Sequence, residues 1–162
     1  MIKILSASQI KELDAYTIQH EPVASIELME RACRAFTNWL VERYDATHRI
    51  GIICGTGNNG GDGLGIARML REWNYPVKVW VVRGGVKETT DFQINLKRLE
   101  GKILISEISS EVKPEDFSEC TMLIDAVFGS GLSRPVEGIY EEVIDCLNAV
   151  PAIKVAVDIP SG

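Results

Sequence analysis

The stretch "CGTGNNGGDGLGIAR", residues 54–68, contains six glycines, two adjacent asparagines and no lysine. It follows an apolar run, "RIGIIC" at residues 49–54, and it leads into a segment that predicts a helix over residues 62–73. A glycine-rich turn between a strand and a helix presents backbone N–H groups that favour an anion such as phosphate. The turn therefore predicts a phosphate-containing ligand. The same glycines and asparagines also suit a tight turn with a purely structural role.

Two common nucleotide-binding loops fit this stretch poorly. Residues 55–60 match the dinucleotide pattern G-x-G-x-x-G, but Arg83, Gly84 and Gly85 stand where an acidic ribose-binding residue is expected. This disfavours an ordinary NAD-dependent dehydrogenase, although an arginine there would suit a 2′-phosphate. Because no G-K-[ST] triplet occurs, the loop is not a Walker A loop, which disfavours a kinase.

Short apolar runs alternate with helix-like segments along the rest of the chain. This alternation predicts β-α-β units and a parallel sheet ordered 3-2-1-4-5, with ligands bound at its carboxyl edge. Two helices precede the sheet: one capped by Ser6 that ends near His20, and one capped by Ser25. The predicted strands are residues 49–54, 77–82, 102–106, 121–127 and 153–159, and the further predicted helices are residues 62–73, 89–99 and 137–150.

Length and composition indicate one ordinary globular domain over residues 1–162. The net charge of −6 disfavours nucleic acid as a partner, and the chain contains no run long enough to span a membrane. The four cysteines form no C-x-x-C pair, which favours reduced thiols in a cytoplasmic protein. The last residues, Ser161 and Gly162, come directly after a strand and a turn, so we expect that the C-terminal part of the domain is missing.

Two more polar loops follow later predicted strands. "DAVFGSGLSRPVEG", residues 125–138, begins with Asp125 at a strand end, and it contains a Gly-Ser-Gly nest and Arg134, which both suit an anion. "DIPSG", residues 158–162, places Asp158 at the end of the last predicted strand. A single aspartate at a strand end also fits a turn or a helix cap. Because the carboxyl ends of parallel strands share one edge, we expect all three loops at one rim.

The segments "GTGNNGGDGLGIAR", "DAVFGSGLSRPVEG" and "VAVDIPSG" together resemble the YjeF N-terminal domain family, the NAD(P)HX epimerases. The resemblance also covers the leading "SASQIKELDAYTI" and "LMERA". It implies an α/β fold, namely a Rossmann-like three-layer α/β/α sandwich with a mainly parallel sheet and the N-terminal helices packed on it.

The same resemblance implies an activity. Family members are isomerases that interconvert the R and S epimers of NADHX and NADPHX, the hydrated and damaged forms of the reduced nicotinamide cofactors. The S epimer is returned to NAD(P)H by an ADP- or ATP-dependent NAD(P)HX dehydratase, which is often fused C-terminally in bacteria. Family members are often homodimers.

Carried over by position, the family's potassium ligands are Asn59, Asp125 and Ser161, so one K⁺ per subunit is implied. Carboxamide, carboxylate and hydroxyl oxygens suit a hard cation. The resemblance places the substrate contacts on Asn58, Asn59, Gly60, Gly61, Asp62, Gly129, Ser130, Gly131, Leu132, Ser133, Arg134, Pro135 and Asp158.

The chemistry of such a substrate suggests a mechanism. C6 of the hydrated ring is a hemiaminal carbon, so loss of its hydroxyl gives a planar iminium, and water can return on either face. We hypothesise that Asp158 is catalytic, giving the proton to the departing hydroxyl and then offsetting the positive charge as a carboxylate.

The main alternative is a non-catalytic module of the same fold that binds nucleotides or RNA and dimerises, as in eukaryotic mRNA-decapping scaffolds. The negative net charge and the intact set Asn59, Asp125, Asp158 and Ser161 favour the enzyme. An NADP-dependent oxidoreductase is a further alternative, but the sequence shows no catalytic segment for a second substrate.

Overall fold

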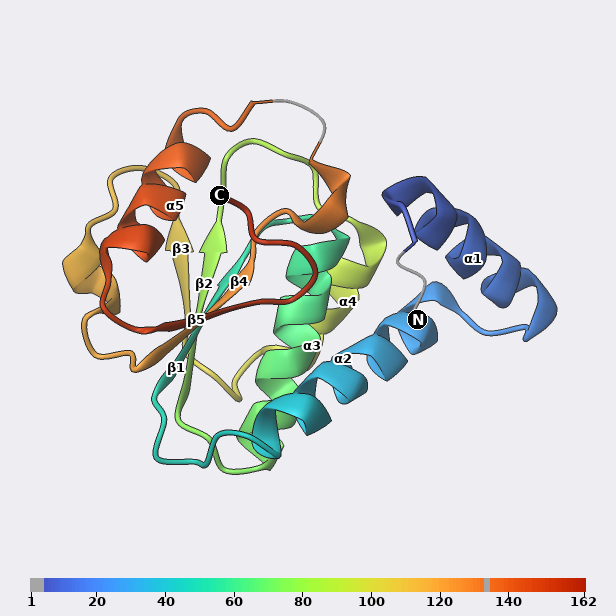
Figure 1. The fold of residues 1–162 in the computed structure, drawn as a ribbon, viewed down its shortest axis with the longest axis horizontal. Coiled ribbons are helices and arrows are strands. Elements are labelled where there is room, and N and C mark those ends of the chain that lie inside the picture. Colours follow the sequence, from blue (N-terminus) through green and yellow to red (C-terminus); the bar gives the residue numbers. More distant parts are fainter. Residues whose placement is uncertain (1–4, 133–134) are drawn as a thin grey trace.

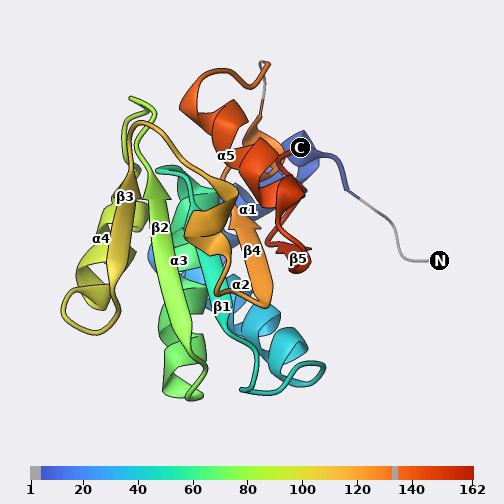
Figure 2. The same cartoon turned by 90° about the vertical axis from the view of Figure 1, so that its left-hand side faces the viewer.

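The structure is a computed structural model that describes residues 5–132 and 135–162. Five parallel strands form one sheet in the order β3-β2-β1-β4-β5, which confirms the predicted order and direction. Figures 1 and 2 show the sheet between two layers of helices. The strands are β1 (Ile50–Cys54), β2 (Val77–Val82), β3 (Ile105–Ile108), β4 (Met122–Ala126) and β5 (Ile153–Ala156).

Helices cover the two faces of the sheet unequally. One face carries three helices: α2 (Ser25–Val41), α3 (Asn58–Glu72) and α4 (Thr90–Leu99). The other face carries α5 (Ile139–Ala149) and a 3₁₀ turn at Pro114–Phe117, which lie in front of β1 and β4 in Figure 2 and leave β2 and β3 in view. The three-layer α/β arrangement expected from the sequence is confirmed.

The central strand β1 separates two hydrophobic cores. Every residue of β1 is buried, as expected for a parallel strand covered on both faces. Because side chains alternate along a strand, Ile52 packs with Leu64 of α3, while Ile53 packs with Val143 of α5. The apolar run that predicts this strand thus contributes side chains to both hydrophobic cores.

Two glycines allow α3 to begin very close to the end of β1. A Cβ atom on Gly60 would lie 1.8 Å from the carbonyl oxygen of Gly55, and a Cβ on Gly55 would lie 2.1 Å from that of Val127. Real Cβ atoms do not approach backbone this closely, so only glycine fits at either position. The helix therefore begins at Asn58, earlier than the predicted start at residue 62.

The first helix, α1 (Ala7–His20), departs from one expectation. Its predicted capping box is confirmed: the Gln9 amide donates to Ser6 Oγ over 3.3 Å, and the Ser6 amide donates to Gln9 Oε1 over 2.9 Å. However, Figure 1 shows α1 standing away from the sheet, next to the start of α2. The prediction that both N-terminal helices pack on the sheet layer is correct for α2 and wrong for α1. Leu13 and Tyr16 of α1 are more than half exposed, so the helix does not bury these apolar side chains against the sheet layer.

Three element boundaries also differ from the prediction. Strand β3 begins at Ile105 rather than residue 102, because Gly101 at φ +70° and a hydrogen bond from the Lys102 amide to Leu99 O extend the turn after α4. Strand β5 ends at Ala156 rather than residue 159. Ser25 does not cap α2, because its hydroxyl donates instead to Asp91 Oδ2 over 2.6 Å.

The close contact at Gly60 gives a stability prediction. Gly60→Ala should lower the free energy of unfolding by about 1–3 kcal/mol or more, because the added methyl group overlaps backbone that cannot move aside. Gly57→Ala is the matched control, since a Cβ there meets nothing within 4 Å and alanine is only a poorer helix cap. Urea unfolding of both variants measures the difference. Equal losses would show that the contact with Gly55 does not constrain the turn.

Candidate active site

A hollow with a volume of about 860 Å³ lies at the carboxyl edge of the sheet. Its size is that of a ligand pocket. The start of α3, the loop after β4 and the end of β5 all contribute to its wall, so the three polar loops meet as expected. The predicted site residues on this wall are Asn58, Asn59, Asp62, Ser130, Gly131 and Asp158.

Side-chain hydrogen bonds hold the glycine turn against its neighbours. The Thr56 hydroxyl donates to the carbonyl of Val86 over 3.1 Å, and the Thr89 amide donates to the carbonyl of Thr56 over 3.1 Å. From helix α4, the buried side-chain amide of Asn95 donates to the carbonyl of Gly61 over 2.9 Å. The first turn of α3 is therefore fixed from both the loop after β2 and helix α4.

Asp158 reaches from the end of β5 to the loop after β4. Its Oδ2 atom accepts a hydrogen bond from the Ser130 amide over 2.7 Å. Gly129, at φ +64°, lies between this carboxylate and Asn59: a Cβ on Gly129 would be 3.0 Å from both Asp158 Oδ2 and Asn59 Cγ. The positive φ and the tight space both require glycine here. This geometry brings the three predicted loops into direct contact.

Asp125 and Ser161 form a compact polar pair beside this contact. The Ser161 amide donates to Asp125 Oδ2 over 2.7 Å, and the Ser161 hydroxyl donates to Asp125 Oδ1 over 2.8 Å. The Val127 amide also donates to Oδ1 over 3.1 Å, and the Phe128 amide donates to Ser161 Oγ over 3.2 Å. Residues that are distant in sequence are thus held together by a fully hydrogen-bonded carboxylate.

Asn59 carries an unsatisfied polar group in this neighbourhood. The side chain is buried, and its Nδ2 atom has no hydrogen-bond partner among the described residues. A buried amide without a partner costs free energy and is uncommon in native proteins. Such an atom points to a ligand, water or ion at this position.

Asp62 has the most unusual surroundings of the carboxyl groups on the wall. Burial raises its pKa to about 7, and the negative charges of Asp158, Asp91 and Asp14 act in the same direction. The hydrogen bond from the Cys33 thiol, with Sγ 3.6 Å from Oδ1, partly opposes this rise. Burial also raises the pKa of Cys33 far above its usual range, so the thiol stays protonated and serves as a donor.

Sequence reasoning missed an aromatic pair on the wall. The rings of Phe128 and Tyr140 lie 4.9 Å apart between centroids, and Tyr140 packs directly on the backbone of Gly84. Phe128 belongs to the second polar loop, but nothing in the sequence links it with Tyr140 in the first turn of α5. Sequence reasoning also missed the contact between the Cys33 thiol on α2 and Asp62 on α3.

Several predicted substrate contacts do not lie on the cavity wall. Gly60 and Gly61 are buried beneath it, and Leu132 and Pro135 are exposed outside it. Ser133 and Arg134 fall outside the described residues. Gly129 is likewise not part of the wall, and the ligand contacts implied for all of these residues, on or off the wall, stay predictions.

The cavity wall is acidic. Of its described residues, Asp14, Asp62 and Asp158 carry carboxyl groups, whereas none is a lysine or an arginine. Arg83, which the sequence offered for a 2′-phosphate, is instead paired with Glu88 and Glu107. An anionic ligand would therefore depend on backbone N–H groups and on charges outside the described wall.

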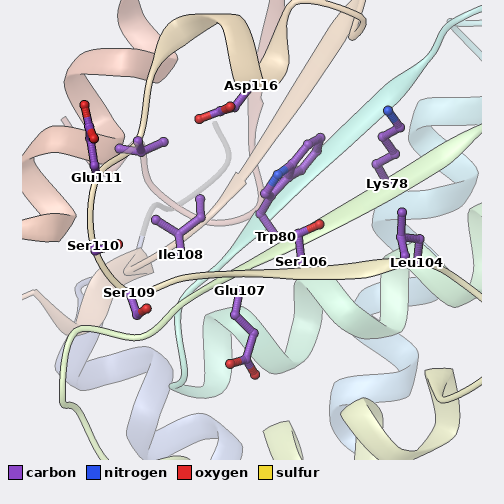
Figure 3. A pocket seen from close by; sticks show the side chains of 11 residues that line it. Lys78, Trp80, Leu104, Ser106, Glu107, Ile108, Ser109, Ser110, Glu111 and Asp116 are labelled. Atoms are coloured by element: carbon purple, nitrogen blue, oxygen red, sulfur yellow. The ribbon is translucent and has the colours of Figure 1, made fainter.

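A smaller hollow of about 420 Å³ lies over β2 and β3, on the face opposite α3 (Figure 3). Its charged groups already have partners: Lys78 pairs with Glu119, Glu111 with Lys113, and Asp116 accepts from the Lys113 amide. Figure 3 shows Glu107 pointing to the other side of β3 from Trp80. Glu107 forms an ion pair with Arg83. The larger cavity is therefore the candidate active site.

The described residues lack two further features that a functional site could use. None of their helices is long and apolar enough to cross a membrane. They also contain no cluster of three or more His, Cys, Asp or Glu side chains that could hold a metal ion.

Comparison with known proteins finds one matching family model and several relatives of this chain. The family model described as "YjeF-related protein N-terminus" matches residues 25–162. The NAD(P)H-hydrate epimerase of Oenococcus oeni is 40% identical over 98% of this chain and 74% of its own length. That of Limosilactobacillus fermentum is 35% identical, with the same coverage of both chains.

Two further relatives extend the comparison. The bifunctional NAD(P)H-hydrate repair enzyme Nnr of Thermofilum pendens is 34% identical over 99% of this chain, which spans 32% of that enzyme. The crystal structure of the yeast protein YNL200c matches 99% of this chain and 72% of its own, with a TM-score of 0.80 and 25% identity.

Proposed function

The chain belongs to the family of the YjeF-related protein N-terminus, and we propose that it is an NAD(P)H-hydrate epimerase. Such an isomerase interconverts the R and S epimers of hydrated NADH and NADPH, NADHX and NADPHX. The names of the relatives support this function. The observation that carries it is one nucleotide-sized cavity in which Asp62, Asp158 and the start of α3 meet.

The cavity has what the reaction requires. Epimerisation at C6 of the hydrated ring needs a proton for the departing hydroxyl and an anion near the resulting iminium. Asp158 is held at the wall by the Ser130 amide, so its carboxylate is oriented before the substrate binds. We assign Asp158 as the catalytic residue that faces the positive charge.

The dinucleotide would be held mainly by backbone groups. The N-terminal turn of α3 presents N–H groups to the cavity, and a helix N-terminus favours a pyrophosphate. In the loop after β4, the amides of Val127, Phe128 and Ser130 already donate to side chains, so this loop would contribute mainly through Arg134, the cation in its sequence. The aromatic pair Phe128 and Tyr140 offers an apolar wall for a ring.

Asn59, Asp125 and Ser161 fit one K⁺ ion per subunit. They supply a carboxamide, a carboxylate and a hydroxyl, which are the hard oxygen donors that such a cation takes. The unpartnered amide of Asn59 supports the fit, because an amide turned over about its last bond would present its oxygen where the unsatisfied nitrogen now lies. A bound cation would supply positive charge that offsets the phosphates near two aspartates.

The proposal also covers partners and location. The bifunctional relative supports a link to an ADP- or ATP-dependent NAD(P)HX dehydratase that consumes the S epimer, as a fused or separate protein. Four free and buried cysteines are consistent with a cytoplasmic enzyme. A homodimer is proposed from the family resemblance, and the acidic wall disfavours nucleic acid as a ligand.

The cation assignment predicts that K⁺ stabilises the protein. Thermal unfolding should show a higher midpoint in potassium chloride than in lithium chloride of the same concentration. Asp125→Ala should abolish this difference because it removes the only carboxylate of the set. Asp145→Ala, which removes an exposed carboxylate of α5, should keep it. Equal potassium effects in both variants would contradict the assignment.

Asp158→Asn tests the proposed function. The change keeps the shape of the side chain but removes the negative charge, so epimerisation should fall by about 10²–10⁴-fold while substrate binding weakens much less. The assay supplies R-NADHX with an excess of S-specific dehydratase and follows the return of NADH absorbance. Rates are compared with an enzyme-free control, because epimerisation is also spontaneous.

Asp145→Asn serves as the control for a general effect of removing a carboxylate. If Asp158→Asn epimerises at the wild-type rate, Asp158 only positions the substrate. If the wild-type protein itself does not exceed the enzyme-free rate, the proposed function is wrong.

A further inference from the structure

The two carboxyl groups of the cavity differ in their surroundings. Asp158 is exposed and accepts a short hydrogen bond from a backbone amide. Asp62 is largely buried on α3, and its carboxyl group accepts a hydrogen bond from the Cys33 thiol, a weak donor. Two carboxyl groups with unlike surroundings in one site are the usual arrangement when one must be an acid and the other an anion.

Acidic groups surround Asp62 on several elements. Asp158 faces it from the end of β5, Asp91 from the start of α4 and Asp14 from α1. On α2, Cys33 contributes its neutral thiol, and Glu30 beyond it is paired with Arg68 and Arg98. This field and the burial of the side chain both favour the protonated form of Asp62.

From this arrangement we infer that Asp62 is the carboxylic acid that protonates the departing hydroxyl, while Asp158 remains the anion beside the cationic ring. The inference rests on the proposed epimerase function. It divides between two residues the roles that the sequence suggested for Asp158 alone. Asp62 thereby becomes a catalytic residue rather than only a substrate contact.

The proton and electron balance is complete without any other reactant. The Asp62 proton moves to the hydroxyl on C6, the C6–O bond breaks, and its electron pair leaves on water. The lone pair of ring N1 forms the C=N bond of the iminium, and Asp62 is left as a carboxylate. Water then adds to the opposite face of C6, and its surplus proton returns to Asp62.

The first experiment is the pH dependence of kcat/KM in the coupled assay. For the wild type, the value should be level below about pH 7 and fall tenfold per pH unit above it, because the acid must be protonated at the start. Asp62→Asn should lower kcat by about 10²–10⁴-fold, with little change in KM, and should remove this limb. The enzyme-free rate is subtracted at each pH.

Substitutions at two residues near Asp62 should move the falling limb of the pH profile of kcat/KM in opposite directions. Cys33→Ala removes the thiol hydrogen bond that lowers the pKa of Asp62, so the limb should shift to higher pH. Asp14→Asn removes a negative charge that raises this pKa, so the limb should shift to lower pH. The readout for both variants is the pH at which kcat/KM begins to fall, compared with the wild type.

The second experiment does not depend on turnover. An Asp62 pKa that is raised in the folded state destabilises the protein as pH rises from about 4 to about 7, because the unfolded chain ionises first. Asp62→Asn should therefore unfold at a higher temperature than the wild type at pH 8. The difference should disappear at pH 3, where the carboxyl group is protonated in both states.

The outcomes distinguish failure of the proposed epimerase function from failure of the acid role of Asp62. A wild-type protein without epimerase activity refutes the proposed function, and the stability comparison then still reports whether Asp62 is protonated near neutral pH. An active wild type whose Asp62→Asn variant keeps kcat, or raises only KM, refutes the acid role. Equal unfolding temperatures for the wild type and Asp62→Asn at pH 8 also refute it.

Discussion

The first turn of α3 lies directly on the backbone at the end of β1, and the site depends on this contact. A side chain at Gly60 would overlap the carbonyl oxygen of Gly55 at 1.8 Å, and one at Gly55 would overlap that of Val127 at 2.1 Å. Glycine at these two positions therefore allows the start of α3, the end of β1 and the end of β4 to pack backbone against backbone. Any larger residue would push these three segments apart and open the site.

This arrangement concentrates carboxyl groups where backbone N–H groups converge. Asp62 and Asp158 face the same cavity, and the described wall contains no lysine or arginine to neutralise them. Clustered carboxyl groups in a part-buried site cost stability, as does the unpartnered amide of Asn59. Both features are typical of sites shaped for a ligand, because the bound ligand supplies the missing partners.

Patterns within short stretches of sequence predicted most of the fold. Buried apolar runs located the strands, and the capping box of Ser6 and Gln9 located the start of α1. Predictions failed where distant contacts decide the outcome. Ser25 binds Asp91 across 66 residues rather than capping α2, and α1 stands apart from the sheet, next to the start of α2.

The candidate site was predicted to a similar degree. The motifs placed the three loops at one rim, and the structure brings Asp125 and Ser161, which the resemblance names for a cation site, into hydrogen-bond contact. What the sequence could not provide is the burial of each group. Burial raises the pKa of Asp62 most, and acids on α1, on α4 and after β5 add to the rise. Its contact with Cys33 depends on how α2 packs on α3.

The most direct test of the account is where the diphosphate part of the proposed substrate binds. Backbone amide NMR signals would be followed while ADP-ribose is added in potassium buffer. The account predicts saturable shifts at residues 57–62 and at Ser130, with no change at Ser106–Glu111, which line the hollow over β2 and β3. Largest shifts at that second hollow, or no shift at the start of α3, would contradict it.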